Sequence, residues 1–502
     1  MRFTSLVIEL IRARPKLVVW LVIVLQAMLW LLVSLSVYRG PPGDLATVIA
    51  LGREYRVGTE LGPPLAFWLA DIAFRASGNH MFGVYVLAQV CSISTFWTLY
   101  LLARATVGVQ QAVLAVLLTM TVLAFGAPGL EFGPLVLARP IWALLLLHSW
   151  QLIGQNRRNA WFAWSIEAGL LLLTTPAAIL LLAFVVGFAL MTARGRRILM
   201  SLDALFALLV IVVLALPYLI WLVRADVPVF PQWPAVADLS GRAVHGVELL
   251  GGLLLASMGV AIVSGFNSGW FDRTQEEAPV IFRPPVDPAA RDFVYFFAFA
   301  PALGGCVISG LYGLDHVVGG AGIVLLMSGL AAIVACGDLI HLRRQQILRT
   351  VWAAVILAPA IGVVAATLFV PWSTSSEVVT SLPTAAIGHF FDDSFERRTN
   401  RRLAAVSGDA QLATLISLSP TRPHLFLATR PERTPWLNLD KFKQTGGVVV
   451  WRASDTDGTP PSDIAKLFPG IAPEVPQSFD RLVNGRQPLL RIGWAIVRPK
   501  AP

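Results

Sequence analysis

Asp44 and two nearby arginines are the first residues of the chain whose types and spacing suggest chemistry. Asp44 follows Pro-Pro-Gly, and Arg53 and Arg56 come soon after it. A carboxylate can remove a proton from a hydroxyl group, and arginines can bind a phosphate group. Other roles are open as well. An aspartate in this position commonly caps a helix, which is compatible with a role as a base, and the arginines can face solvent or headgroups instead.

Further candidates lie at a double proline and inside a later apolar segment. We expect Glu60, Pro63 and Pro64 to contribute to substrate binding, although Glu60 can instead be a solvated loop residue. Arg139 falls inside the fourth apolar segment, where a charge is costly and suggests function. From its position we infer a phosphate-binding role for Arg139, with snorkelling to the headgroups as the alternative.

Other titratable residues point less clearly to a site. Glu167 in the fifth apolar segment can pair with a cation, relay a proton or join two helices, and His148 is expected to be a packed core residue. His389 with Asp392 and Asp393 has too few ligands for a convincing metal motif. We therefore expect no metal site and no cofactor, although a divalent metal is not excluded.

The composition places most of the chain in a membrane. Of the 502 residues, 56% are hydrophobic and 14% are charged, whereas a soluble domain has about 25% charged residues. Stretches of about 20 apolar residues, enough to cross a bilayer, occur before residue 372 and not after it. We expect a mainly α fold, with a transmembrane helical bundle over residues 1–371 and a soluble α/β domain over residues 372–502.

Eleven spans are expected, and the first is a retained span because its apolar run is longer than the core of a signal peptide. The fifth and sixth spans are short and meet at a turn over Thr174–Pro176. The expected ranges are 17–38, 82–103, 109–126, 135–153, 160–175, 177–193, 203–223, 245–264, 293–312, 318–341 and 350–371.

The basic residues indicate orientation rather than nucleic-acid binding. The net charge is +9, but no run of five or more basic residues occurs. Arginine clusters such as Arg157–Arg158 and Arg343–Arg344 alternate with the arginine-poor loops 127–134 and 313–317. The positive-inside rule then places the N-terminus in the cytoplasm and residues 372–502 outside. Membrane lipids, and not nucleic acids, are the expected partners.

The long segment 39–81 is more than a connector. Two amphipathic helices, near 44–56 and 64–76, fit its apolar spacing and are expected to lie along the membrane surface. In the C-terminal part we expect helices at 392–403, 409–417 and 461–467, and strands at 403–407, 424–428, 448–451 and 489–497.

The run from Asp44 to Arg104 resembles the first extracytoplasmic loop of the membrane GT-C glycosyltransferases of family 39. Relatives of this kind include protein O-mannosyltransferases and the bacterial aminoarabinose and galacturonic acid transferases that act on lipid A. The residues that carry the resemblance are Gly43-Asp44-Leu45, Tyr55, Gly62-Pro63-Pro64-Leu65, Ala66–Ala76 and Tyr100-Leu101-Leu102-Ala103-Arg104.

The resemblance implies an inverting glycosyltransferase with Asp44 as the catalytic base. Its donor would be a polyprenyl-phosphate sugar. Its acceptor would be lipid A, lipopolysaccharide or another glycolipid at the outer face of the bacterial inner membrane. The C-terminal domain would be periplasmic. Arg139, Arg53 and Arg56 are the expected phosphate ligands.

This chain departs from the family pattern at two positions. Leu45 stands where relatives often have a second acidic residue, and Gly62 stands where they often have His or Lys. Glu131 matches a position that is acidic in many relatives, although a surface-loop role is equally open. The departures keep a second hypothesis open, a non-catalytic scaffold derived from the same fold. A lipid or sugar transporter is a third, although no internal repeat of the kind common in transporters is visible.

Overall fold

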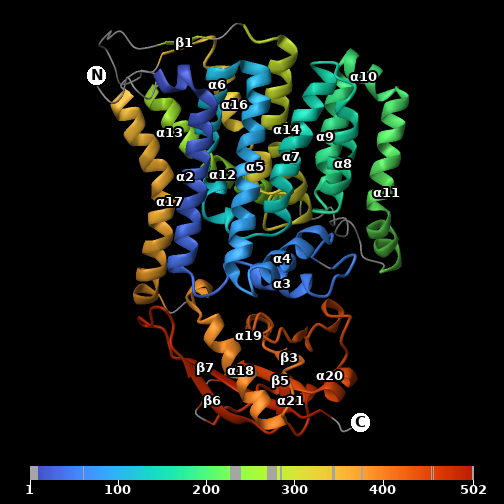
Figure 1. Ribbon diagram of the computed structural model, residues 1–502, viewed down its shortest axis with the longest axis vertical. Coiled ribbons are helices and arrows are strands. Elements are labelled where there is room, and N and C mark those ends of the chain that lie inside the picture. Colours follow the sequence, from blue (N-terminus) through green and yellow to red (C-terminus); the bar gives the residue numbers. More distant parts are fainter. Residues whose placement is uncertain are drawn as a thin grey trace.

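The computed structural model describes residues 9–59, 61–225, 239–267, 280–282, 285–341, 345–374, 377–453, 455 and 457–499. A bundle of apolar helices forms one end of the molecule and a smaller sheet-containing domain forms the other (Figure 1). Segment 39–81 follows the first long helix of the bundle and lies between the bundle and the sheet-containing domain. The predicted fold class, a helical membrane bundle with a small C-terminal α/β domain, is confirmed.

Among the residues that the structure describes, six helices are long and apolar enough to cross a membrane. They are α2 (Pro15–Val37), α5 (Met81–Val107), α7 (Pro134–Ile153), α11 (Leu202–Arg224), α14 (Pro288–Tyr312) and α17 (Gln345–Ser373). Apolar side chains are stable in contact with lipid. The helical conformation is stable there as well, because it satisfies backbone polar groups within the segment.

The remaining apolar segments are bent or short. Two pairs bend at a break, α9 (Ala178–Met191) with α10 (Ala193–Leu199) by 117° and α12 (Leu239–Ala256) with α13 (Met258–Asn267) by 49°. If each pair counts as one span, the described residues hold up to eight spans. Shorter apolar helices are α6 (Val109–Thr119), α8 (Ala160–Leu172), and α15 (Ala321–Val324) with α16 (Ser328–Ala335).

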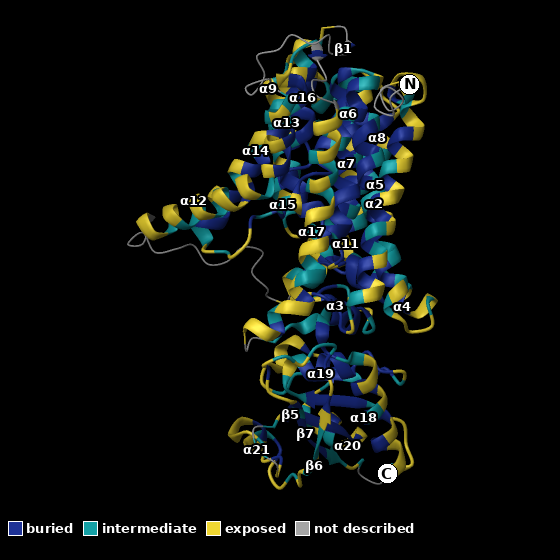
Figure 2. Cartoon of the chain, turned by 90° about the vertical axis from the view of Figure 1, so that its left-hand side faces the viewer, coloured by how far each residue is buried: buried dark blue, intermediate teal, exposed yellow. Residues whose placement is uncertain are grey.

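Every predicted span therefore contains an apolar helix, but the count of eleven stays a prediction. Three expected spans differ in detail. Within 109–126 helix α6 ends at Thr119, and within 245–264 the chain breaks between α12 and α13. Residues 318–341 do not form a continuous helix, because Gly319 and Gly320 have φ of +94° and +75° and because α15 and α16 are separate. At its end, β2 (Leu339–His341) pairs antiparallel with β1 (Val280–Phe282). Figure 2 shows α12 leaning away from the other helices, with much of its length exposed.

The C-terminal domain contains a five-stranded mixed sheet in the order β4-β3-β5-β7-β6. Its strands are β3 (Ala405–Gly408), β4 (His424–Phe426), β5 (Gly447–Arg452), β6 (Glu474–Phe479) and β7 (Leu490–Val497). Strand β3 is parallel to β4 and β5, whereas β7 is antiparallel to β5 and β6. The helices are α18 (Thr384–Thr399), α19 (Ala410–Ile416), α20 (Leu439–Thr445) and α21 (Ser462–Leu467), with short 3-10 turns at Val379–Ser381 and Pro431–Arg433.

Segment 39–81 folds into the two helices that its periodicity predicts, α3 (Leu45–Gly52) and α4 (Leu65–Ala76). They lie between the bundle and the C-terminal domain (Figure 1). All residues of α3 except Thr47 are buried. Helix α3 ends at Gly52, short of the expected range of 44–56, and Asp71 of α4 is paired with Arg422 of the C-terminal domain. The position of the two helices along the membrane surface stays a prediction.

Candidate active site

Asp44 stands at the N-terminal end of α3, but its side chain does not cap the helix. Its backbone carbonyl accepts the first helical hydrogen bond, from Val48 N at 3.0 Å. No capping hydrogen bond involves its carboxylate, so the structure does not support the capping role for the side chain. The carboxylate is therefore available for another interaction.

Glu131 lies beside Asp44, in the loop that precedes α7. A Cβ atom added at Gly43, which has φ of +52°, would lie 2.5 Å from Glu131 Oε2. Glycine at position 43 thus allows the Glu131 carboxylate to approach the start of α3. Burial raises the pKa of Glu131, the negative charge of Asp44 raises it further, and the positive charge of Arg139 opposes both effects.

Arg139 projects from α7 and is buried, with 7% of its surface exposed. Its guanidinium lies 5.5 Å from the centre of the Phe125 ring. Among the described residues it forms no ion pair, and its Nε has no hydrogen-bond partner. A Cβ atom at Gly322 would lie 2.4 Å from Nε, so glycine makes room for the cation there. A buried guanidinium without a carboxylate partner is costly and is suited to bind an anion.

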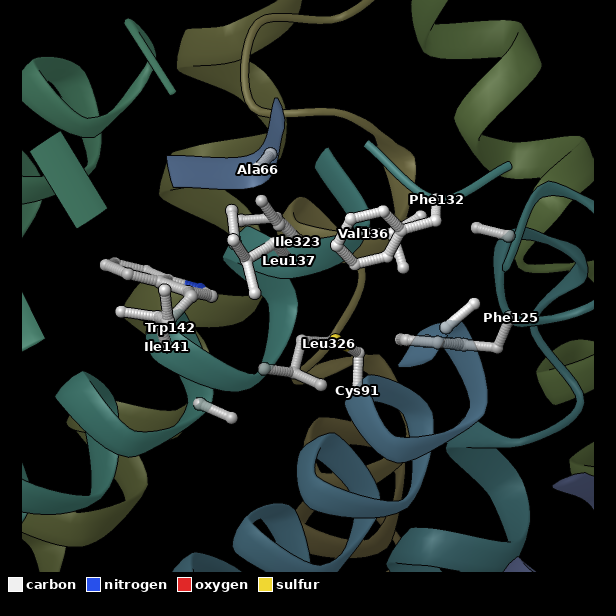
Figure 3. Close-up of a cluster of buried hydrophobic side chains, with 14 of the residues drawn as sticks. Ala66, Cys91, Phe125, Phe132, Val136, Leu137, Ile141, Trp142, Ile323 and Leu326 are labelled. Atoms are coloured by element: carbon white, nitrogen blue, oxygen red, sulfur yellow. The ribbon is translucent and has the colours of Figure 1, made fainter. Parts of the chain in front are cut away.

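Glu131 and Arg139 line one pocket of about 480 Å³. Other lining residues come from α7, the end of α12, α17 and the stretch Gly319–Ile323 at the start of α15. The loop before α7 adds Leu123, Ala124, Ala127 and Pro128. Figure 3 shows apolar side chains packed alongside, among them Phe125, Val136 and Ile323. The pocket therefore combines an apolar lining with a few charged groups, which is typical of a site for an amphipathic ligand.

Arg53 and Arg56 lie at the other end of α3. A separation of nine residues along a helix corresponds to about 13 Å between Asp44 and Arg53. Arg53 is partly buried near Asp71, Arg75 and Arg422, and burial lowers its pKa. The side chain of Arg56 is exposed. The structure thus does not group these two arginines with Arg139, and their phosphate-binding role stays a prediction.

A polar cluster joins segment 39–81 to the C-terminal domain. Asp71 is fully buried and receives Arg422 Nη2 at 2.6 Å, Arg75 Nε at 2.8 Å and the Tyr55 hydroxyl at 3.0 Å. Beside it, His424 Nδ1 lies 2.7 Å from Glu54 Oε1. The only sequence signal for this cluster was charge on a helix face, and nothing in the sequence indicated that the partner lies 351 residues away.

The double proline packs against the turn between α8 and α9. Pro63 and Pro64 are buried, and Leu65 N donates to Leu173 O at 3.0 Å. Gly62 has φ of +129°, a conformation that only glycine adopts readily. A backbone constraint therefore accounts for glycine in place of a basic residue at this position. Glu60 lies outside the described residues.

Two further candidates pair with each other inside the bundle. His148 Nδ1 of α7 lies 2.8 Å from Glu167 Oε1 of α8. Glu167 thus joins two helices through His148, which agrees with one of its open roles, whereas His148 is more than a packed core residue.

Among the residues that the structure describes, no group of three or more His, Cys, Asp or Glu side chains could hold a metal ion. Asp392 accepts hydrogen bonds from Ser419 and Thr421.

Known proteins share features with this chain. Residues 62–221 match the sequence model of a family described as dolichyl-phosphate-mannose-protein mannosyltransferase. Two crystal structures of ArnT from Cupriavidus metallidurans have the same fold, each with a TM-score of 0.62 at 13% sequence identity. The one bound to undecaprenyl phosphate aligns over 95% of this chain and 97% of that chain. The apo form aligns over 97% and 98%.

A search of curated proteins found no match. The family match and the structural likeness agree with the resemblance carried by Asp44–Arg104. The chain therefore has the fold of the GT-C membrane glycosyltransferases, and the family 39-like resemblance is confirmed.

Proposed function

We propose that this protein is an inverting glycosyltransferase that moves a sugar from a polyprenyl-phosphate donor to a glycolipid acceptor such as lipid A. The observation that carries the proposal is one pocket in a GT-C fold, with Asp44 beside Glu131. The pocket holds Glu131 and the buried Arg139, whose Nε has no hydrogen-bond partner among the described residues. A fold shared with an ArnT structure bound to undecaprenyl phosphate supports the donor class.

Asp44 is suited to activate the acceptor hydroxyl, and Arg139 is suited to stabilise the leaving phosphate. Asp44 takes the proton of the acceptor hydroxyl as that oxygen attacks the anomeric carbon, which is the role of a general base. The bond between that carbon and the phosphate oxygen breaks at the same time, and the lipid phosphate leaves with its negative charge. Arg139 binds this phosphate, where a fixed cation in an apolar site stabilises developing charge. The apolar pocket wall accommodates the start of the lipid tail.

The test is transfer of labelled sugar from a panel of polyprenyl-phosphate donors in proteoliposomes. We expect Asp44→Asn to lower the rate about 10²-fold or more, because the base is lost. Arg139→Gln should lower it by about 10², because one stabilising donor of the transition state is lost. Asp393→Asn is the matched control, since Asp393 is exposed in the C-terminal domain.

The same experiment separates the alternatives. If wild type transfers no sugar from any donor although it is folded and inserted, the non-catalytic scaffold is favoured. If radiolabelled lipid crosses the membrane without transfer, the transporter is favoured. If Asp44→Asn transfers as fast as wild type, the base assignment is wrong.

A further inference from the structure

A second pocket lies at the end of the bundle opposite the C-terminal domain. It is formed where α2 begins and α5 ends. The other end of α2 reaches the C-terminal domain, because Arg39 N donates to Thr380 O at 2.8 Å. A helix of 23 residues is about 35 Å long, so this pocket and the C-terminal domain lie at opposite ends of the spans (Figure 1).

The pocket is basic and has no acidic residue in its lining. Its volume is about 400 Å³, and its lining includes Arg14, Lys16, Leu17, Tyr100, Arg104 and Val109. Arg14, Lys16 and Arg104 form no ion pair with any residue that the structure describes. Three cations that surround one cavity without a counter-charge favour an anionic ligand.

Tyr100 provides an independent indication of a ligand. Its side chain is fully buried, with 0% of its surface exposed. Within the described part of the chain its hydroxyl has no hydrogen-bond partner. A buried hydroxyl normally has a partner, and this one belongs to a residue in the wall of the basic pocket. It can donate a hydrogen bond to an oxygen of a bound anion.

An aromatic and apolar surface leads from the pocket along the helices. The Tyr100 ring lies 5.3 Å from that of Trp97, which lies 4.8 Å from that of Trp20. Leu17, Trp20 and Leu21 of α2 are exposed, and in a membrane they face acyl chains. Such a surface next to a basic pocket fits a molecule with an anionic head and an apolar tail better than a free anion.

We propose that this pocket binds the headgroup of an anionic phospholipid, whose acyl chain lies along Trp20 and Trp97. Arg14, Lys16 and Arg104 surround the phosphate, and the Tyr100 hydroxyl donates to one of its oxygens. Basic pockets between spans at the membrane surface recognise anionic headgroups in this way. The site is distinct from the pocket at Arg139 and does not depend on glycosyl transfer.

Native mass spectrometry of the purified full chain, titrated with phosphatidylglycerol and with neutral phosphatidylcholine, tests the proposal. We expect wild type to bind phosphatidylglycerol more tightly. Arg104→Gln should raise its dissociation constant about fivefold, since one cation near the headgroup is lost. Tyr100→Phe removes only the hydroxyl and should raise the constant about threefold, a smaller effect because a single hydrogen bond is lost.

Arg194→Gln is the matched control, because Arg194 is an exposed arginine of α10 at the same end of the bundle. Its affinity for phosphatidylglycerol should equal that of wild type. Equal affinities in all variants, or equal affinity for the two lipids, would overturn the proposal. Displacement of the lipid by millimolar inorganic phosphate would also overturn it, since the site would then recognise a free anion. Unchanged melting temperatures show that each variant is folded.

Discussion

Glu131, which lines the pocket at Arg139, and the neighbouring Asp44 repel each other electrostatically. Gly43 allows Glu131 to approach the start of α3, where Asp44 stands. The local sequence favoured a capping role for Asp44, and only the motif around it pointed to a base. In the structure the Asp44 carboxylate does not cap α3, and Glu131 lies next to it. The family resemblance pointed to an acid at Glu131 but left a surface-loop role equally open. Its proximity to Asp44, 87 residues away, has no local signal in the sequence.

Substitution of Glu131 should change stability in a pH-dependent way. Its pKa is raised above the ordinary 4.5, so the folded protein binds the proton more tightly than the unfolded chain does. Stability therefore falls as the pH rises through the raised pKa, and ionised Glu131 destabilises the fold at neutral pH. We expect Glu131→Gln to stabilise the protein at pH 7.5 by about 0.5 kcal/mol, as for a partly exposed charge pair.

Thermal unfolding followed by tryptophan fluorescence at pH 7.5 and pH 4 measures this effect. The gain should shrink at pH 4, where Glu131 is largely protonated in wild type as well. Glu396→Gln, an exposed site in the C-terminal domain, should show no such gain. An equal gain at both pH values would contradict a cost of ionised Glu131, which arises from its burial first and from repulsion by Asp44 second.

At the level of elements, α4 is attached to the C-terminal domain by a buried ion pair. Asp71 and Arg422 are 0% and 7% exposed, and the Arg422 guanidinium also lies 4.8 Å from the Phe74 ring. Asp71→Asn leaves Arg422 buried without a carboxylate and should cost about 3–5 kcal/mol. Arg422→Met should cost less, about 2 kcal/mol, because Asp71 retains Arg75 and Tyr55.

Thermal midpoints and the rate of proteolytic release of the C-terminal domain report on this attachment. The double variant should lose less stability than the sum of the two single losses, since the two residues interact directly. His424→Gln is the control, because its pair with Glu54 is partly exposed and should contribute about 0.5 kcal/mol. A loss from Asp71→Asn no larger than that of His424→Gln would refute the assigned role.

The turn before α4 gives a second prediction for an element. Gly62→His installs a residue type that relatives often have at this position, but at φ of +129°. We expect a loss of about 2 kcal/mol from backbone strain and no gain in transfer. Leu61→His introduces the same side chain at an exposed neighbour and should have little effect. A Gly62→His variant as stable as wild type and faster in transfer would show that glycine replaced a functional cation.

Sequence periodicity predicted most elements of segment 39–81 and of the C-terminal domain, but it missed helix α20 and strand β6. It also began the helix expected at 392–403 eight residues too late, because α18 covers Thr384–Thr399. Helices α3 and α4 and strands β3, β4, β5 and β7 lie near their expected ranges. Strand β6 was not predicted because its sequence, EVPQSF, contains Pro476 and few apolar residues. Proline is tolerated on an edge strand, and β6 is the last strand of the sheet. Tertiary pairing with β7, rather than local propensity, determines this strand.

For the whole molecule, apolar composition predicted the bundle, whereas the contacts between segment 39–81 and the C-terminal domain could not be predicted. Arg39 with Thr380, Asp71 with Arg422 and Glu54 with His424 join segments that are hundreds of residues apart. In the sequence, the polar residues on either side of these contacts look like those of a solvated surface. These contacts place segment 39–81 and the C-terminal domain on the same side of the membrane.

That shared side allows a test of orientation. The arginine distribution predicts that residues 372–502 lie outside the cytoplasm. Alkaline phosphatase fused after residue 499 should therefore be active, because the enzyme requires an oxidising compartment for its disulfides, and green fluorescent protein at the same site should be dark. A fusion after residue 341 lacks α17, which is long and apolar enough to cross once, and should show the reverse pattern. The same signal from both fusion sites would mean that α17 does not cross the membrane. Phosphatase activity only at residue 341 would invert the whole protein, which would place Asp44 and the pocket at Arg139 on the cytoplasmic side and move the proposed transfer to that face.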